Sequence, residues 1–547
     1  MMKNINLNKK KGRFYSNLLI LALLLQLVSC NKFLDTQPQN VTAVSNYFTT
    51  ATQLNNALTG VYDILATSNV YGDAMWDAFS VATDESYYTV STTISGPQIL
   101  NFTSSESSIA NTWSDLYTGI NRANLVLENI DKPVMDSASR ATIKGQALFL
   151  RAYYYFLLVS NWGDVPLKLH STNSPDSISI SRKKDTTVYN QIIGDMIAAD
   201  SLVQPATFYN YAGRITNTTV EGILARVCLY RAGLFTAGFS KIDDRAIWFA
   251  NSLYWSSKVI NSGIHTLNPS YSQVFINHCQ DVYDVNYKES MWEVEFYGTG
   301  NGNPYPQSGR VGNISGIKCT DLSMGYSYGY IDAQSKLYNS FAVGDSFRRD
   351  WSIAPYHLDT VLGGGGVVTQ VRWTATSIYT RNNGKWRREF ENGNNKQKNG
   401  TSINYPLLRY ADVLLMYAEA ANEVNGHPTD SAYLAVNQVR RRAYKLPLAT
   451  TNVKYDLKGG LSYQSFQDSI RNERYKELCF EALRRNDLIR WGKYLSTMQD
   501  MANNMPAGAS AMAAVAANNI QPKNVLFPIP INELSLNPGI GKQNAGW

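Results

Sequence analysis

Two glutamates that stand two residues apart form the most suggestive catalytic pattern in the sequence. Glu293 and Glu295 lie in the segment "SMWEVEFYG", where apolar and polar residues alternate as in a β-strand. Glycoside hydrolysis needs two carboxylates flanking one bond, and residues i and i+2 of a strand share a face. The same spacing also fits a half-buried strand whose Trp292, Val294 and Phe296 point inward. We favour this structural interpretation.

A second carboxylate pair, Asp84 and Glu85, adjoins Tyr87 and Tyr88 and fits a polar loop or helix start better than an active site. The five histidines are scattered, and no HExxH or GxSxG segment is present. Four glycines at 363–366 are not followed by Lys-Ser or Lys-Thr, so they make no phosphate-binding loop. The sequence therefore predicts no catalytic residue, no metal site, no cofactor and no enzymatic activity.

A third candidate is the stretch "NERYKELCFEALRRNDLIRWG", residues 472–492, which holds five cations and four carboxylates. Opposite charges stand three or four residues apart, as partners on one helix do. The expected pairs are Glu473–Lys476, Arg474–Glu477, Glu481–Arg485 and Asp487–Arg490. Because the signs are interleaved, no net field remains to attract a phosphate chain. We predict an ion-paired packing helix.

The charge of the whole chain also argues against a nucleic-acid partner. The 547 residues carry a formal charge of +7, but five cations and no acid fall in residues 1–29, which leaves +2 for the rest. A nearly neutral protein has no bulk electrostatic attraction for nucleic acid.

Tyrosine is the residue type that stands out in the composition. There are 35 tyrosines and 11 tryptophans, and many lie in polar, Gly- and Asn-containing stretches. Aromatic faces stack on the C–H patches of sugar rings, so exposed aromatics on loops predict a sugar-binding site. Two regions qualify, 69–91 and 297–330, and for each residue core packing or loop anchoring is the alternative. The candidates are Tyr71, Trp76, Tyr297, Tyr305, Tyr326 and Tyr328.

The N-terminus has the pattern of a secretory signal. A basic segment ends at Arg13, and an apolar run over 18–28 is shorter than the about 17–25 residues needed to span a bilayer. It is followed by "LVSC", which resembles a bacterial lipobox. We therefore expect cleavage after residue 29 and a lipid anchor on Cys30; a plain cleaved signal is the alternative. Free thiols are favoured over disulfides for the other four cysteines.

The elements that must position these residues are mostly helical. Apolar residues at three-and-four spacing predict helices over 52–65, 110–130, 138–163, 216–235 and 248–263, and again over 410–426, 430–446 and 472–492. Paired in sequence, they suggest a tetratricopeptide-type array. Residues 265–404 differ: the strand-like segment at 290–298 lies among Gly-, Asn- and Tyr-rich loops, typical of short hairpins and binding loops. The tail over 520–547 is irregular.

Several segments together resemble one protein family. They are "CNKFLDTQPQ" after the lipobox, "LFLRAYYYFLLVSNWGDVPL", "LLRYADVLLMYAEAANE" with "VNQVRRRA", the charged stretch at 472–492, and the tail "LFPIPINELSLNPGIGKQNAGW". In this order they are similar to the SusD/RagB outer-membrane lipoproteins of Bacteroidetes. The family often has glycine where this chain has Ala482, and a Pro-Gly before its last aromatic where this chain ends Ala-Gly-Trp.

This resemblance implies a mainly α SusD-like fold with tetratricopeptide-like hairpins and a loop-rich ligand face with short β-hairpins. It implies a lipid-anchored protein on the outer membrane, facing the cell exterior. Such a protein passes oligosaccharide or polysaccharide to a partner SusC-like TonB-dependent transporter. We expect a signal peptide over 1–29 and one domain over 30–547. That domain comprises a helical scaffold (about 45–264 and 405–505), a ligand-face insert (about 265–404) and the tail. A RagB-like peptide binder and a lipid-anchored glycoside hydrolase are the alternatives.

Overall fold

The computed structural model describes residues 47–172, 179–233, 245–297, 308–360, 368–393 and 396–547, and this part of the chain is mainly α-helical. The helices are α2 (Ala51–Asp63), α3 (Ser107–Glu128), α4 (Ser137–Trp162), α5 (Asp185–Asp200), α6 (Asn217–Ala232), α7 (Arg245–Asn261), α8 (Tyr271–Gln280), α9 (Ser335–Ser340), α10 (Ser346–Ser352), α11 (Tyr410–Asn425), α12 (Asp430–Ala443), α13 (Tyr463–Glu477), α14 (Arg484–Arg490), α15 (Tyr494–Asn503), α16 (Ala511–Asn519) and α17 (Ile531–Leu536).

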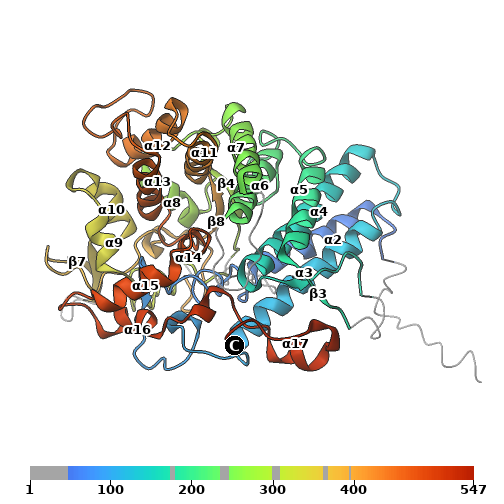
Figure 1. Cartoon of the computed structure of the whole chain (residues 1–547), viewed down its shortest axis with the longest axis horizontal. Helices are drawn as coiled ribbons and strands as arrows, with labels where there is room; N and C mark the ends of the chain where they lie inside the picture. Colours follow the sequence, from blue (N-terminus) through green and yellow to red (C-terminus); the bar gives the residue numbers. More distant parts are fainter. Residues whose placement is uncertain (1–46, 173–178, 234–244, 298–307, 361–367, 394–395) are drawn as a thin grey trace, which may run out of the picture.

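Helices α2 to α7 form an array in which each helix packs against the next one in the chain. The array continues from α7 to α11, which also contacts α12 and α13, so two stretches far apart in sequence make one layer (Figure 1). Side chain spacing explains the packing: α3 buries Ile109, Trp113, Leu116 and Ile120 along one stripe. The predicted helical hairpins are confirmed.

The strands are short and pair two by two, always antiparallel. They are β1 (Ser86–Tyr88) with β5 (Ile331–Ala333), β2 (Val165–Pro166) with β3 (Arg182–Lys183), β4 (Ser290–Val294) with β8 (Tyr405–Arg409), and β6 (Tyr356–Thr360) with β7 (Val368–Arg372). The β4–β8 pair lies between the two helical halves (Figure 1). A strand is confirmed over Ser290–Val294, and Trp292, Val294 and Phe296 are buried as expected. The expectation of a half-buried strand is wrong, because all five strand residues, Glu293 included, are buried, and Glu295 and Phe296 lie beyond its end.

The region 265–404 contains three helices, α8, α9 and α10, that the sequence analysis did not predict. In α8 the side chains of Tyr271, Val274, Phe275 and His278 are buried at helical spacing, and Ser270 caps its first turn by accepting from the N–H of Gln273. The helix is only ten residues long. A pattern this short is easily hidden among the Gly- and Asn-rich loops around it. The expected short hairpin is present as β6–β7.

The charged stretch is two helices rather than one. Helix α13 ends at Glu477 and α14 begins at Arg484, and between them Phe480 and Ala482 have positive φ angles of 63° and 58°. Two expected ion pairs form, Glu473–Lys476 at 3.4 Å and Asp487–Arg490 at 2.8 Å. The prediction of a single ion-paired helix is therefore wrong in its geometry, although the stretch is scaffold.

The other two expected pairs, Arg474–Glu477 and Glu481–Arg485, are replaced by partners distant in sequence. Arg474 bonds Asp412 at 2.6 Å, and Glu481 bonds Arg409 at 2.7 Å. Helical spacing could not predict these contacts, because tertiary packing brings the partners together. Most of these charges are buried and paired within the fold, whereas Arg485 donates to the Asn161 side chain and to the carbonyls of Asn524 and Val525, and its Nε atom has no hydrogen-bond partner in the described part of the chain.

The four cysteines outside the N-terminal segment, Cys228, Cys279, Cys319 and Cys479, are buried free thiols, as predicted. Within the described ranges, no helix has the length and apolarity needed to cross a membrane.

Candidate functional site

Four tyrosine rings form a continuous row, Tyr326, Tyr328, Tyr330 and Tyr88, which we call the tyrosine row. Ring centroids are 4.9 Å apart for Tyr326–Tyr328, 5.0 Å for Tyr328–Tyr330 and 5.7 Å for Tyr330–Tyr88. All four residues are half-buried, so each ring is anchored on one side and partly open on the other. A row of partly open aromatic rings is suited to stacking against flat, partly apolar ligands.

The backbone at 325–330 sets the spacing of the row. Tyrosines at every second position stay half-buried while Gly325, Ser327 and Gly329 between them are buried, which is the period of an extended chain. The N–H of Tyr328 donates to the carbonyl of Asn313 at 2.7 Å. The N–H of Thr89 donates to the carbonyl of Tyr330 at 2.9 Å, which brings β1 and Tyr88 into the row.

Gly325 and Gly329 are required where they stand. Their φ angles are 100° and 60°, in the region that favours glycine. A Cβ on Gly325 would lie 2.6 Å from the Cβ of Arg388, and one on Gly329 would lie 2.8 Å from the Cβ of Lys318. Gly325 and Gly329 therefore allow the backbone conformation that holds the tyrosine row in place.

Polar groups surround the row. The guanidinium of Arg310 lies 5.9 Å from the centre of the Tyr328 ring and 3.8 Å from a carboxylate oxygen of Asp73. The ammonium of Lys398 lies 5.0 Å from the centre of the Tyr326 ring, and the Tyr328 hydroxyl donates to Asn399 Oδ1 at 2.8 Å. Rings flanked by such hydrogen-bonding groups match a ligand that has both C–H faces and hydroxyls.

Asp73 and Asp77 add acidity at the Tyr88 end of the row. The Oδ1 atom of each is buried without a hydrogen-bond partner in the described part of the chain, and Gln98 donates to Asp77 Oδ2 at 3.2 Å. Burial, reinforced by the Asp77 charge, raises the pKa of Asp73 to about 8, and burial raises the pKa of Asp77 to about 6. At neutral pH the pair can therefore both donate and accept hydrogen bonds.

The structure places the predicted ligand residues in three different settings. Tyr326 and Tyr328 come together in the tyrosine row. Tyr297 is 58% exposed but lines a separate cavity, with Tyr211 and Tyr283. Tyr305 and the expected lipid site Cys30 lie outside the described residues.

The expectation that Tyr71 and Trp76 are exposed is wrong. They are 6% and 5% exposed. Tyr71 shares a 2.6 Å hydrogen bond with the hydroxyl of Tyr153 and stacks on Tyr405, and the indole N–H of Trp76 donates to the carbonyl of Tyr71. A sugar could reach either ring only by displacing core packing.

Both carboxylate pairs singled out from the sequence have structural partners. Asp84 accepts two hydrogen bonds from Arg484, each of 2.8 Å, and Glu85 accepts one from the N–H of Phe480 at 3.0 Å. Glu293 accepts from the Asn404 amide at 3.1 Å. Within the described ranges no group of three or more potential ligands is arranged to hold a metal ion.

Sequence reasoning missed half of the row and its polar neighbours. Tyr330 continues the every-second-residue pattern of Tyr326 and Tyr328, so the alternation itself was a usable signal. Tyr88 and Arg310 reach the row only through tertiary contacts, and nothing in their local sequence indicates it.

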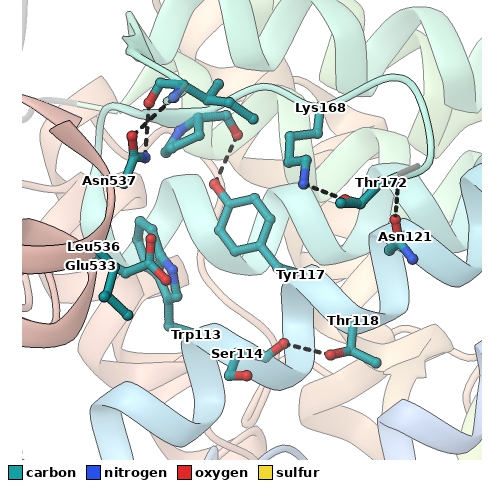
Figure 2. Close-up of a pocket in the computed structure, with 12 residues that line it drawn as sticks. Trp113, Ser114, Tyr117, Thr118, Asn121, Lys168, Thr172, Glu533, Leu536 and Asn537 are labelled. Carbon is teal, nitrogen blue, oxygen red and sulfur yellow. Dashed lines mark hydrogen bonds between the residues drawn. The ribbon is translucent and has the colours of Figure 1, made fainter. Parts of the chain in front are cut away.

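A pocket of about 550 Å³ lies elsewhere, between α3, the β2 region and α17, with Tyr117 at its centre (Figure 2). The Tyr117 hydroxyl donates to the carbonyl of Pro166 at 2.7 Å, and the Lys168 ammonium donates to the Thr172 hydroxyl at 2.7 Å. None of the residues predicted to bind ligand lines it. Asn537 of the tail exchanges two hydrogen bonds with the backbone of Ile180, at 2.9 and 3.0 Å, so part of the pocket lining fastens the tail (Figure 2).

Known proteins share both the sequence pattern and the architecture of this chain. A model described as "SusD family" matches residues 288–547, and one described as "Starch-binding associating with outer membrane" matches residues 32–229. SusD-like protein P25 of Formosa agariphila is 24% identical, with the alignment covering 96% of this chain and 97% of the relative.

Two solved structures share the fold. A SusD homolog from Bacteroides thetaiotaomicron VPI-5482 is 28% identical and superposes with a TM-score of 0.83, covering 93% of this chain and all of the other. Surface glycan-binding protein A from Bacteroides fluxus is 19% identical, with a TM-score of 0.68 over 91% of this chain and all of the other. The mainly α architecture with few short strands is thus one that known proteins share.

Proposed function

Because the chain belongs to the SusD/RagB family, we propose that it is a non-enzymatic cell-surface lipoprotein that binds oligosaccharide or polysaccharide on the tyrosine row. It delivers the bound glycan to a partner SusC-like TonB-dependent transporter in the outer membrane. Lipid on Cys30 anchors it to that membrane, facing the cell exterior.

The observation that carries the proposal is the tyrosine row itself. Its rings follow one another at 4.9–5.7 Å, tilted or edge-to-face to one another, so a glycan lying along the row can contact the open parts of successive rings. Arg310, Lys398 and the Asp73–Asp77 pair offer donors and acceptors to the hydroxyls. One structural relative is named as a surface glycan-binding protein, in agreement with this role.

Replacing Tyr328 by alanine tests the proposal, because Tyr328 contacts the rings on both sides. We expect the Kd for a bound glycan to rise about tenfold or more in isothermal titration, the loss of about 1.4 kcal/mol that one stacking contact supplies. Tyr254→Ala is the matched control, since Tyr254 is exposed on α7 outside the row. Equal affinities of both variants for every glycan of a panel would remove the row from the site.

A glycoside hydrolase is the alternative that one observation favours. Asp73 and Asp77 are two buried neighbouring carboxyls whose pKa values are both raised by burial, and a carboxyl that keeps its proton near neutral pH can act as a general acid. Incubation of the purified protein with the same glycan panel separates the two functions: release of reducing ends that Asp73→Asn abolishes would establish hydrolysis. Binding to peptide pools with none to any glycan would instead favour the RagB-like peptide-binding function.

A further inference from the structure

A second aromatic site lies apart from the tyrosine row. A cavity of about 570 Å³ is lined by the tyrosines and acids of three separate segments. Its defining residues are Tyr211, Tyr283, Tyr297, Asp281, Glu293 and Glu295, and we call it the tyrosine–carboxylate cavity. Its volume is in the range of small-molecule sites. It shares no residue with the tyrosine row.

Open aromatic rings form the mouth of this cavity. Tyr297 is 58% and Tyr211 is 42% exposed, although both line a concave surface. Tyr211 continues into Tyr209, at a centroid distance of 5.4 Å, and Tyr209 into Phe208 at 4.9 Å. This run extends the aromatic surface outward from the cavity, as a chain-like ligand would require.

Three carboxylates line the cavity, of which Glu293 is buried while Asp281 and Glu295 are exposed to solvent. A single amide nitrogen, Asn404 Nδ2, donates to Asp281 Oδ1 at 2.9 Å and to Glu293 Oε2 at 3.1 Å, so these two acids face one donor. Glu295 lies against Gly213, where an added Cβ would stand 2.4 Å from its Oε2 atom. Desolvation in the cavity and the charges of Glu293 and Asp281 raise the pKa of Glu295 to about 7.

The charge of the cavity is not balanced from within. No lysine or arginine is among the residues that line it. His278 contacts Glu293 from behind at 3.4 Å, and the Lys288 ammonium, 5.9 Å from the Tyr283 ring centre, donates to the carbonyl of Ala206. The lining thus combines three acids with four aromatic residues, the three tyrosines and Phe296, and these are the groups that attract an ammonium ion.

We propose that the tyrosine–carboxylate cavity is a second glycan subsite that binds the primary ammonium group of an amino sugar. The ammonium donates to Glu295 and Glu293, while Tyr297 and Tyr211 contact the sugar ring. A neutral sugar would contact the rings but bring no cation to the acids, whose charged neighbours His278 and Arg214 stand outside the lining of the cavity. This inference rests on the proposed glycan-binding function and narrows its substrate class to glycans that carry free amino groups.

The test compares two sugars that differ only in this charge. Isothermal titration of the full mature chain uses the glucosamine trimer and its fully N-acetylated counterpart, in which acetylation removes the ammonium. We expect the trimer with free amines to bind at least tenfold more tightly. Glu295→Gln and Tyr297→Ala should each raise its Kd about tenfold, with unchanged melting temperatures. Asp131→Asn, which removes an exposed acid outside the cavity, should leave it unchanged.

Three results would overturn the inference. The first is equal binding of the two trimers, and the second is binding of the free-amine trimer that neither Glu295→Gln nor Tyr297→Ala weakens. The third is binding of Nα-acetyl-lysine amide that competes with the free-amine trimer and is as tight as the binding of that trimer. The last would assign the cavity to peptide lysines. The proposed binding on the tyrosine row is tested separately, by the effect of Tyr328→Ala on the Kd of every glycan of the panel. An unchanged Kd in Tyr328→Ala, together with a weakened Kd in Glu295→Gln, would remove the tyrosine row from the site and leave the cavity proposal standing.

Discussion

Ala482 adopts a backbone conformation that is unfavourable for alanine. Its φ of 58° is left-handed, which costs a non-glycine residue about 1–2 kcal/mol. Glycine at this position would relieve that strain, at a cost of about 0.5–1 kcal/mol in unfolded-state entropy. We expect Ala482→Gly to stabilise the fold by about 0.5–1 kcal/mol in urea unfolding. Ala57→Gly, inside α2, should destabilise it by about 1 kcal/mol. A loss of stability in both variants would contradict the strain.

Glu85 is a buried carboxyl whose titration should be visible in stability. Burial raises its pKa from 4.5 to about 8, against the opposing effects of the Phe480 N–H, Arg484 and Lys385. The folded state therefore holds the proton more tightly than the unfolded state. The Glu85 contribution is complete below about pH 4.5 and is lost as pH rises to about 8, with a slope of up to about 1.4 kcal/mol per pH unit.

Glutamine at position 85 imitates the protonated acid and does not titrate. We expect Glu85→Gln to match the original protein near pH 4.5 and to become progressively more stable than it between pH 5 and about 8. Urea midpoints measured across this range give the difference directly. Parallel curves for the two proteins would show that Glu85 keeps an ordinary pKa.

At the scale of elements, the junction of α13 and α14 depends on Glu477. Its buried carboxylate contacts Arg442 at 2.6 Å, Arg409 at 3.1 Å and Arg348 at 3.1 Å. Glu477→Gln would leave three buried cations undercompensated and should cost about 3–5 kcal/mol in guanidinium unfolding. Asp468→Asn removes an acid from the same helix, but this acid is 59% exposed, and the cost should stay below about 0.5 kcal/mol. Equal costs would mean that the buried network adds no stability.

The elements also show where sequence reasoning succeeds and where it stops. Helices with a long apolar stripe, such as α3, were predicted because their burial follows local periodicity. The break after Glu477 was not, because distant cations such as Arg409 compete for its acids. For the site, Tyr326 and Tyr328 were found from composition, whereas Tyr71 was misjudged because only its contacts with Tyr153 and Tyr405 bury it.

Across the whole molecule, one cluster of buried apolar side chains extends from Phe48 to Ile540. Both ends of the described chain therefore pack into the same core. The β4–β8 pair lies between the two helical halves. The tyrosine row likewise draws on β1 and on residues 326–330, far apart in sequence. Tyr88 and Tyr330 pack against the shared core, so moving this end of the proposed ligand surface would disturb the core.

Attachment to the membrane is predicted to be independent of this folded unit. The predicted lipid site Cys30 precedes Phe48, where the described core begins, and no residue of the tyrosine row belongs to the N-terminal segment. We expect Cys30→Ser to move the protein from the membrane fraction to the soluble fraction of cells, because acyl methylenes supply the attachment. The released variant should keep its glycan Kd within about twofold and its melting temperature unchanged. Retention of Cys30→Ser in washed outer membranes would show that another part of the chain, or a tightly bound transporter, provides the attachment.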